Sequence, residues 1–421
     1  MTNELLQQVR VLDPAAATDR VVDVLIVDGN IEAIADSISE WPADTEVRDG
    51  RGLILGPGLV DLYSHSGEPG FEDRETLRSL QQAAIAGGFT RLNILPDTTP
   101  ALDNPAGLAW LEDKRQFQLP VQVQAWGALT LGVQGQQMTE LAELAAAGVV
   151  GFADGRALSS YGLLRRLLEY LKPLQRPVAL WPCDPKLAGN GVMREGPESI
   201  RFGLPGSPAI AETTAIAALL ELVAAIGTPV HIMRVSTARS VELIQAAKER
   251  GLSITASTTW MHLLLNSQAI QSYDPNLRLE PPLGNPADQA ALIEGVRQGV
   301  LDAIAIDHTP YTYEEKTVAF AEAPPGAIGL ELALPLLWQR FVASDEWSAL
   351  ELWQALSSNP AKCLQEPIAT VASGQPAELA LFNPNQPWVV SGQFLKSLST
   401  NTPWLGQEVL GQIVQTWCTS A

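Results

Sequence analysis

The stretch GPGLVDLYSHSGEPGF, residues 56–71, begins apolar and then becomes abruptly polar. Asp61, Tyr63, His65 and Glu68 follow one another within eight residues. Imidazoles and carboxylates are the ligands of catalytic divalent metals, and such a metal lowers the pKa of bound water from about 15.7 to about 7. The stretch therefore has the composition of a metal-binding strand end in which a tyrosine occupies one ligand position.

Eight strand-like runs, most of them followed by a helical stretch, must position these side chains. The runs are 58–62, 90–95, 121–125, 148–152, 178–181, 229–235, 252–256 and 301–306, and the helical stretches include 75–86, 158–171, 208–226 and 240–250. Eight strand–helix units over about 300 residues predict a closed (β/α)8 barrel. An open doubly wound sheet is the alternative, but no G-x-G-x-x-G follows the first strand.

In such a barrel the reactive groups gather at the carboxyl ends of the strands. The residues expected there are Tyr63, His65, Asp97, Asp154, Trp181, Arg234 and Asp307. These side chains are far apart in the sequence, and the barrel predicts that they surround one pocket.

The two ends of the chain have a different pattern, that of short strands. VVDVLIVDGNIEAIA alternates and turns at Asp28-Gly29-Asn30, which is a hairpin signal. Strand signals return in AELALFNPNQPWVV and GQIVQTWC near the other end. We therefore expect an α/β fold in which residues 1–55 and 366–421 form a small β-sandwich beside a barrel of residues 56–365.

Composition limits the classes of function. The chain has 421 residues, of which 46% are hydrophobic and 18% charged, so it is expected to be globular with a large core. A formal charge of −20 argues against nucleic acid and anionic membranes as partners. Three cysteines make no disulfide framework, and the N-terminus resembles no signal peptide, so a cytoplasmic location is expected.

Motifs along nearly the whole chain resemble the dihydroorotases of the amidohydrolase superfamily, specifically the longer bacterial type. PGLVDLYSHSGEPGFEDRET is similar to the family's Pro-Gly-Leu-Val-Asp-x-His-x-His-x-Arg-x-Pro-Gly opening, and LPDTTPALDNP to its Met-Pro-Asn-Thr segment. Counterparts follow in order in DPKLAGNGVMREG, HIMRVSTARSVELI, RLEPPLGNPADQAALIEGV, IDHTPYTYEEK, PPGAIGLELALPLL and STNTPW. The resemblance implies a metal-dependent barrel with a β-sandwich, which interconverts dihydroorotate and carbamoyl aspartate in pyrimidine synthesis.

Three of the six metal-ligand positions that the resemblance implies hold other residues. The family's first imidazole is Tyr63, its His-Cys-Glu segment begins with Trp181, and its His-Val-Ser segment begins with Arg234. An indole has no lone pair for a metal, and a guanidinium does not deprotonate in a protein. Unit charges about 4 Å apart repel by roughly 4 kcal/mol at an effective dielectric of about 20, and a dication feels about twice that. We expect Arg234 to fill the vacated space and to pair with Asp154 or Asp307.

His65, Asp154 and Asp307 are the residual candidate ligands. Asp154, in GFADGRAL, matches a family aspartate ligand in a motif that is one residue shorter. Asp307 matches the ligand and proton shuttle of the family's Asp-His-Ala-Pro-His motif. The resemblance implies one zinc ion on these residues if the chain is an active enzyme, and the altered positions predict no cofactor.

The substrate-contacting positions that the resemblance implies are altered as well. An Arg is replaced by Gly67, two Asn by Asp97 and Glu280, another Arg by Gly284, and a His by Tyr311. A hydrogen bond to a charged group contributes about 1.5–3 kcal/mol. Losing several such bonds, and adding two acidic groups near an anionic substrate, predicts that dihydroorotate does not bind.

The remaining histidines, His231, His262 and His308, are expected to be structural. His231 lies within an apolar strand, where a hydrogen-bonded core histidine is the more common case. Asp307 is likewise expected to be a buried ion-pair partner once no metal lies beside it.

Two hypotheses of different classes follow. The first is a noncatalytic dihydroorotase homologue that acts as a structural or regulatory partner of aspartate carbamoyltransferase, or as a homo-oligomer. The resemblance implies this transferase, because family members often associate with it. The second is an active dihydroorotase, or another cyclic amidohydrolase, that hydrolyses an amide C–N bond with one residual metal and with Asp307 as the base.

Overall fold

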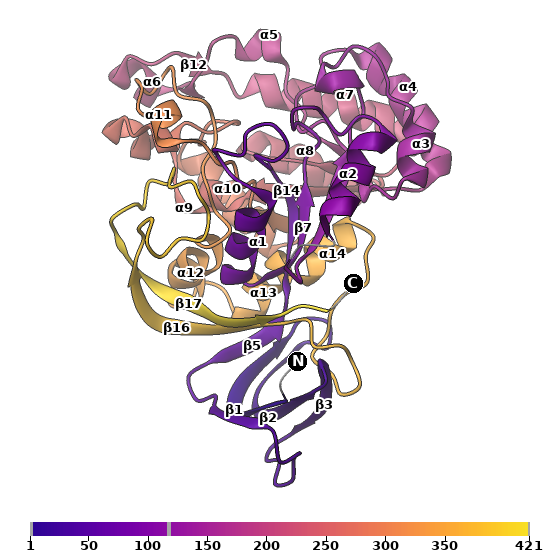
Figure 1. Ribbon diagram of the computed structural model, residues 1–421. Helices are drawn as coiled ribbons and strands as arrows, with labels where there is room; N and C mark the ends of the chain where they lie inside the picture. Colours follow the sequence, from indigo (N-terminus) through magenta and orange to yellow (C-terminus); the bar gives the residue numbers. More distant parts are fainter. Residues whose placement is uncertain (1–2, 116–118, 420–421) are drawn as a thin grey trace.

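A computed structural model describes residues 3–115 and 119–419 and contains a barrel of eight parallel strands (Figure 1). The strands form two sheets. The first consists of β6 (Leu59–Ser64), β7 (Phe89–Ile94), β8 (Gln122–Gly127) and β9 (Gly151–Phe152). The second consists of β10 (Ala179–Leu180), β13 (Val230–Ile232), β14 (Ile254–Thr259) and β15 (Ala303–Ala305). A parallel bridge between Phe152 and Val178 joins the sheets at one seam. At the other, the backbone N–H of Asp307 donates to the carbonyl of Tyr63 at 3.2 Å, so the barrel is closed as predicted.

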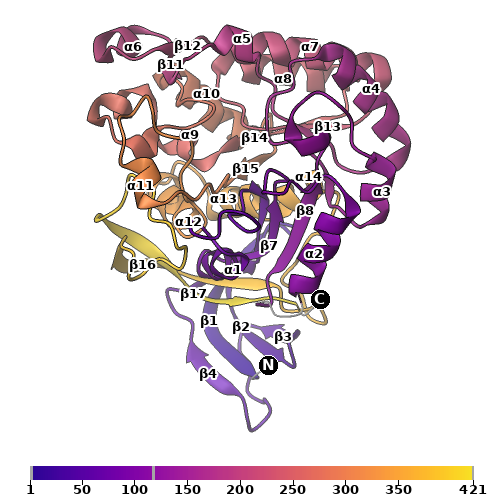
Figure 2. The ribbon, with the colours of Figure 1, turned by 45° about the horizontal axis from the view of Figure 1, so that its top comes forward.

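Helices surround the strands on the outside of the barrel (Figure 2). The longer ones are α1 (Leu77–Ala86), α2 (Pro105–Arg115), α4 (Tyr161–Leu171), α7 (Ile210–Ile226), α8 (Ala238–Glu249), α10 (Pro286–Arg297) and α13 (Ala349–Leu356). Several begin where the sequence supplies a cap. The side chains of Thr76, Ser160 and Thr237 accept hydrogen bonds from the first turns of α1, α4 and α8. These caps fix where each strand-end loop stops and its helix begins.

Shorter helices lie in the loops of the barrel and in the C-terminal part of the chain. The helices are α3 (Leu141–Ala146), α5 (Pro185–Ala188), α6 (Pro197–Phe202), α9 (Trp260–Leu264), α11 (Tyr313–Lys316), α12 (Ala333–Leu337) and α14 (Ser358–Cys363). Between β10 and α7 the chain makes an excursion that also contains the two-stranded pair β11 (Met193–Arg194) and β12 (Gly206–Ser207). The sequence pattern did not predict this excursion.

The ends of the chain form the second part, the β-sandwich. Its sheet runs β17 (Glu408–Trp417), β16 (Leu379–Val389), β5 (Ile54–Pro57), β1 (Glu4–Asp13), β2 (Thr18–Val27), β3 (Asn30–Ala35), and β4 (Glu46–Asp49) pairs with β1. Asp28 and Gly29 turn between β2 and β3 at φ of 48° and 76°, as the hairpin signal predicts. The C-terminal strands lie between the barrel and β1–β3 (Figure 1). The predicted α/β class, a TIM-like barrel with a β-sandwich, is confirmed.

Large aromatic side chains fill the barrel interior below the carboxyl ends. Tyr63, Trp126 and Trp181 belong to one buried cluster with Leu62 and Met233. The indole N–H of Trp126 donates to the carbonyl of Leu62 at 2.9 Å, which satisfies the polar edge of this large side chain. In the described ranges, 3–115 and 119–419, no helix is long and apolar enough to cross a membrane.

Candidate functional site

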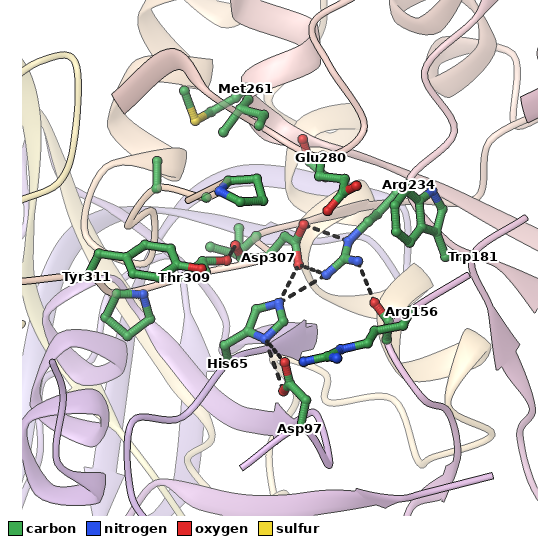
Figure 3. Close-up of a pocket in the computed structure, with 18 of the residues that line it drawn as sticks. His65, Asp97, Arg156, Trp181, Arg234, Met261, Glu280, Asp307, Thr309 and Tyr311 are labelled. Atoms are coloured by element: carbon green, nitrogen blue, oxygen red, sulfur yellow. Dashed lines mark hydrogen bonds and ion pairs between the residues drawn. The ribbon is translucent and has the colours of Figure 1, made fainter. Parts of the chain in front are cut away.

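A cavity of about 650 Å³ opens at the carboxyl ends of the barrel strands (Figure 3). Five of the seven strand-end residues expected there line it, namely His65, Asp97, Trp181, Arg234 and Asp307. Tyr63 is fully buried beneath them, and Asp154 is buried beside the cavity without lining it. The barrel therefore assembles most of the predicted pocket.

Arg234 forms a two-pronged ion pair with Asp307 at the base of this cavity. Nε donates to Oδ2 at 2.8 Å, and Nη2 donates to Oδ1 at 2.6 Å. Nη1 donates to the carbonyl of Gly155 at 2.7 Å, so each nitrogen of the guanidinium has an acceptor. The predicted pairing of Arg234 is confirmed, and Asp307 is the partner.

Burial disfavours both charges of this pair, but mutual attraction outweighs burial. The side chains of Arg234 and Asp307 are only 5% and 14% exposed. Burial is the largest single influence and lowers the pKa of Arg234, but Asp307, with contributions from Tyr63 and Glu280, outweighs it, so the net shift is upward. Burial raises the pKa of Asp307 less than Arg234 and His65 lower it, so the net shift is downward. Asp307 therefore remains an ionised partner of a permanent cation.

His65 connects this pair to a second carboxylate. Its Nδ1 lies 2.8 Å from Oδ2 of Asp97, and its Nε2 lies 3.1 Å from Nη2 of Arg234 and 3.6 Å from Oδ1 of Asp307. Burial lowers the pKa of His65, but Asp97 and Asp307 overcome this effect and raise it to about 9. Figure 3 shows the resulting chain of alternating charges, Asp97, His65, Asp307 and Arg234. The protonated ring lies 3.6 Å from Oδ1 of Asp307, so that His65 and Arg234 share this carboxylate as an ion-pair partner.

Two aromatic rings enclose the guanidinium. The carbon Cζ of Arg234 lies 5.7 Å from the ring centre of Tyr63 and 5.4 Å from that of Trp181, within the range of cation–π attraction. The Tyr63 hydroxyl accepts a hydrogen bond from the backbone N–H of Arg234 at 3.2 Å. Burial and the charge of Asp307 raise the pKa of Tyr63, so its phenol stays protonated. The two replacement aromatics thus pack around the replacement cation.

Asp154 has a structural role and does not pair with Arg234. Its Oδ1 accepts the backbone N–H groups of Leu129 and Thr130 at 2.8 and 3.0 Å, and its Oδ2 accepts the Thr130 hydroxyl at 2.6 Å. Burial raises the pKa of Asp154, and these hydrogen bonds oppose the shift. The carboxylate therefore anchors the loop that follows β8.

These residues do not fit a divalent cation. Within the described part of the chain, no three His, Cys, Asp or Glu side chains are arranged to hold a metal ion. His65 and Asp307 approach each other, but the guanidinium of Arg234 is bound to Asp307 and lies 3.1 Å from Nε2 of His65, and the oxygens of Asp154 are bound elsewhere. A dication at this position meets a fixed positive charge.

Four of the five altered substrate positions line this pocket, and Gly284 does not. Asp97 is bound to His65, Glu280 is exposed at the rim, and Tyr311 lies in the wall with its ring centre 4.9 Å from Cζ of Arg74. A Cβ added at Gly67 would lie 2.4 Å from the carbonyl oxygen of Glu75. No side chain fits there without a shift of the backbone.

Sequence reasoning missed Arg156 as a pocket residue. It lines the cavity, is exposed, and points toward His65 and Asp97 in Figure 3. Its charge is one of the influences that lower the pKa of Asp97 against the effect of burial. Its position two residues after Asp154, at a strand end, is the sequence feature that could have identified Arg156 as a pocket residue.

His231 confirms the prediction of a core histidine. Its Nδ1 and Nε2 each lie 2.9 Å from a hydroxyl, of Thr255 and Ser257 respectively. Burial, with a contribution from Lys248, lowers its pKa to about 3, so the ring is neutral. It takes no part in the pocket.

Comparison with known proteins identifies the family. A model of the family described as "Dihydro-orotase-like" matches residues 52–240. A probable dihydroorotase-like protein of Synechocystis sp. is 47% identical, with 98% of this chain and 99% of that protein covered. A dihydroorotase of Pelobacter propionicus is 38% identical over 98% of this chain and 97% of its own length.

Solved structures agree on the fold. An L-hydantoinase (dihydropyrimidinase) from Arthrobacter aurescens has a TM-score of 0.84 at 21% identity, with 100% of this chain and 98% of that chain covered. At this identity the likeness concerns the fold alone. The full-length relatives show that the chain belongs to the dihydroorotase-like family of the amidohydrolase superfamily.

Proposed function

We propose that this chain is a dihydroorotase homologue without catalytic activity, which serves pyrimidine biosynthesis through protein contacts and binds no catalytic metal. The observation that carries the proposal is the ion pair of Arg234 with Asp307, at 2.8 and 2.6 Å. In the resemblance Asp307 is both a metal ligand and the proton shuttle. Here both of its oxygens are bound to a guanidinium.

The chemistry of amide hydrolysis lacks its main components in this pocket. Hydroxide at neutral pH requires a metal or a base with a pKa near the working pH. Burial raises the pKa of Asp307, but Arg234 and His65 reverse the effect and hold it below its ordinary value, which makes it a weak base. One-metal catalysis with His65, Asp154 and Asp307 requires that Arg234 leave its buried pair and that Asp154 release its loop.

The proposed partner is aspartate carbamoyltransferase. The support is the family resemblance together with an intact scaffold around an altered site. A chain that keeps its barrel, its caps and its sandwich while its reactive positions change is suited to a role in assembly.

Two measurements on the purified chain test the proposal. Elemental analysis after growth with added zinc is expected to find no stoichiometric metal in this chain. The Pelobacter propionicus dihydroorotase, prepared in parallel, serves as the comparison. A tagged chain recovered from its own cells is expected to bring the transferase with it. One zinc ion per chain contradicts loss of the metal site, and a chain that elutes alone contradicts the partner role.

A further inference from the structure

The C-terminal hairpin, β16 and β17, presents an apolar outer surface. Strand β17 lies at the end of the sheet and pairs with β16. Two of its outward side chains, Leu410 and Val414, are 42% and 46% exposed, and the exposed Pro387 of β16 lies opposite Leu410. The alternate residues Val409 and Gly411 are buried. The hairpin therefore packs one face onto the molecule and leaves an apolar face open to solvent.

The loop that joins the two strands adds further exposed apolar side chains. Phe394, Leu398 and Leu405 are 54%, 56% and 47% exposed. The loop is held to the barrel, for example by the backbone N–H of Leu398, which donates to the buried Glu75 at 3.1 Å. The hairpin and this loop lie together at the left edge of the molecule (Figures 1 and 2). We name the exposed apolar side chains of both the hairpin surface, namely Val389, Phe394, Leu398, Leu405, Leu410 and Val414.

The hairpin surface lies in a part of the chain that has almost no charge. Between residues 379 and 419 the sequence contains two charged side chains, Lys396 and Glu408, whereas 18% of the whole chain is charged. Edge strands that stay unpaired are usually protected by charged residues, and β17 has only Glu408, at its first position. Exposed apolar side chains gathered where charge is depleted are typical of a protein interface.

The charge of the chain favours a second copy of itself as the occupant of this surface. Two chains with a formal charge of −20 repel each other, and the repulsion is smallest where both present a surface without net charge. A two-fold contact brings the same surface of both copies together, and one Lys and one Glu suit such self-pairing because their signs are opposite. A strongly acidic or basic partner would find no complementary charge here.

We propose that the hairpin surface is the contact between two copies of this chain, which form a symmetric dimer. The contact buries the exposed apolar side chains of both copies and covers the edge strand β17. It lies on the β-sandwich part of the molecule, whereas Arg234 and Asp307 lie at the barrel mouth. The dimer therefore requires neither a metal nor a functional pocket.

Sedimentation equilibrium of the purified full chain tests this proposal. At micromolar concentration the expected mass is about twice the 45.2 kDa of one chain. Val414→Lys and Leu410→Lys each place a charge in the apolar contact of both copies, and each is expected to weaken association about tenfold or more. A wild type that sediments as a monomer overturns the proposal, and so does a dimer that is equally tight in both variants.

Val21→Lys is the matched control, because Val21 is a 55% exposed valine of β2 in the same sheet and lies outside the hairpin surface. It is expected to dimerise like the wild type, and circular dichroism checks that each variant is folded. Raising the salt concentration from about 0.05 to about 0.5 M is expected to leave the dimer intact or to strengthen it, because salt screens the repulsion of the two net charges. Dissociation by salt would show a contact held by opposite charges and overturn the proposal.

These measurements are made without the transferase, so their failure is distinct from failure of the proposed partner role. One result would connect the two. A wild-type monomer that recovers the transferase from cells, while Val414→Lys does not, would assign the hairpin surface to the transferase and overturn the proposal of a second copy.

Discussion

Arg234 and Asp307 meet across the mouth of the barrel in a planar, two-pronged ion pair with N–O distances of 2.8 and 2.6 Å. The two residues follow β13 and β15, and both have positive backbone φ, 54° and 53°. Positive φ is uncommon in residues other than glycine and persists where the surroundings fix it. The backbone thus holds both side chains in position to meet.

Removal of Arg234 is expected to destabilise the protein strongly. Arg234→Met leaves the ionised Asp307 buried without its main partner, and breaking a buried pair in this way costs about 3–5 kcal/mol. Arg239→Met is the matched control, because the pair of Arg239 with Glu242 is exposed, with 63% exposure of each side chain. An exposed pair contributes about 0–1 kcal/mol. Denaturant unfolding of both variants measures the difference, and equal losses would contradict a buried structural pair.

The stability of the protein is expected to depend on pH through His65. Burial lowers its pKa, but Asp97 and Asp307 raise it from 6.5 to about 9. A raised folded-state pKa gives stability that is fully present below about pH 6.5 and is lost as the pH rises through about 9. Each pKa unit corresponds to about 1.4 kcal/mol, so the rise from 6.5 to about 9 makes the loss about 3–4 kcal/mol.

His65→Gln isolates this contribution, because other groups titrate alike in both proteins. The free energy of unfolding is measured for both across this pH range. The advantage of the wild type is expected to shrink toward high pH. An advantage that grows with pH would show that the folded protein prefers a neutral His65.

Asp154 is expected to contribute to stability and not to metal binding. Asp154→Ala leaves the buried N–H groups of Leu129 and Thr130 without an acceptor, and each such group costs about 1–3 kcal/mol. Asp103→Ala removes the acceptor of two exposed hydrogen bonds, from the backbone N–H of Gly132 and the side chain of Asn104, and is expected to cost less than about 1 kcal/mol. Thermal unfolding compares the two variants. A metal content that falls only in Asp154→Ala would contradict this role.

Much of the fold was predictable because the apolar runs and caps that build a barrel are local signals. Helix α7 was expected at 208–226 and spans Ile210–Ile226. Strand lengths were less predictable, since the run 148–152 contains only the short β9, Gly151–Phe152. Parallel barrel strands are continuous apolar stretches whose ends depend on neighbours. The excursion with β11 and β12 was missed, because its sequence has no strong hydrophobic periodicity.

The site was predictable where residue type alone decides the chemistry. A permanent cation among carboxylates predicts an ion pair, and Arg234 forms one. The choice of Asp307 over Asp154 was not predictable, because the backbone N–H groups and the hydroxyl that bind Asp154 lie in the loop after a different strand.

Restoring the imidazoles is expected to restore metal binding. The combined substitution Tyr63→His, Trp181→His and Arg234→His adds three ligands near His65 and Asp307 and removes the fixed positive charge. Zinc content measured after dialysis is expected to rise in this variant. Arg234→His alone is expected to raise the zinc content only slightly. The same combination with His65→Ala is the control. Equal zinc in wild type and the combined variant would contradict the view that these positions exclude metal.

The most direct test of the central claim is turnover of dihydroorotate by the purified full chain. The assay follows both hydrolysis and the reverse cyclisation of carbamoyl aspartate, with excess zinc, beside the Pelobacter propionicus dihydroorotase. If the chain has lost its activity, its rate equals that of a blank without protein, while the comparison enzyme converts dihydroorotate. A rate above the blank that scales with the concentration of this chain and disappears with a chelator would contradict the claim.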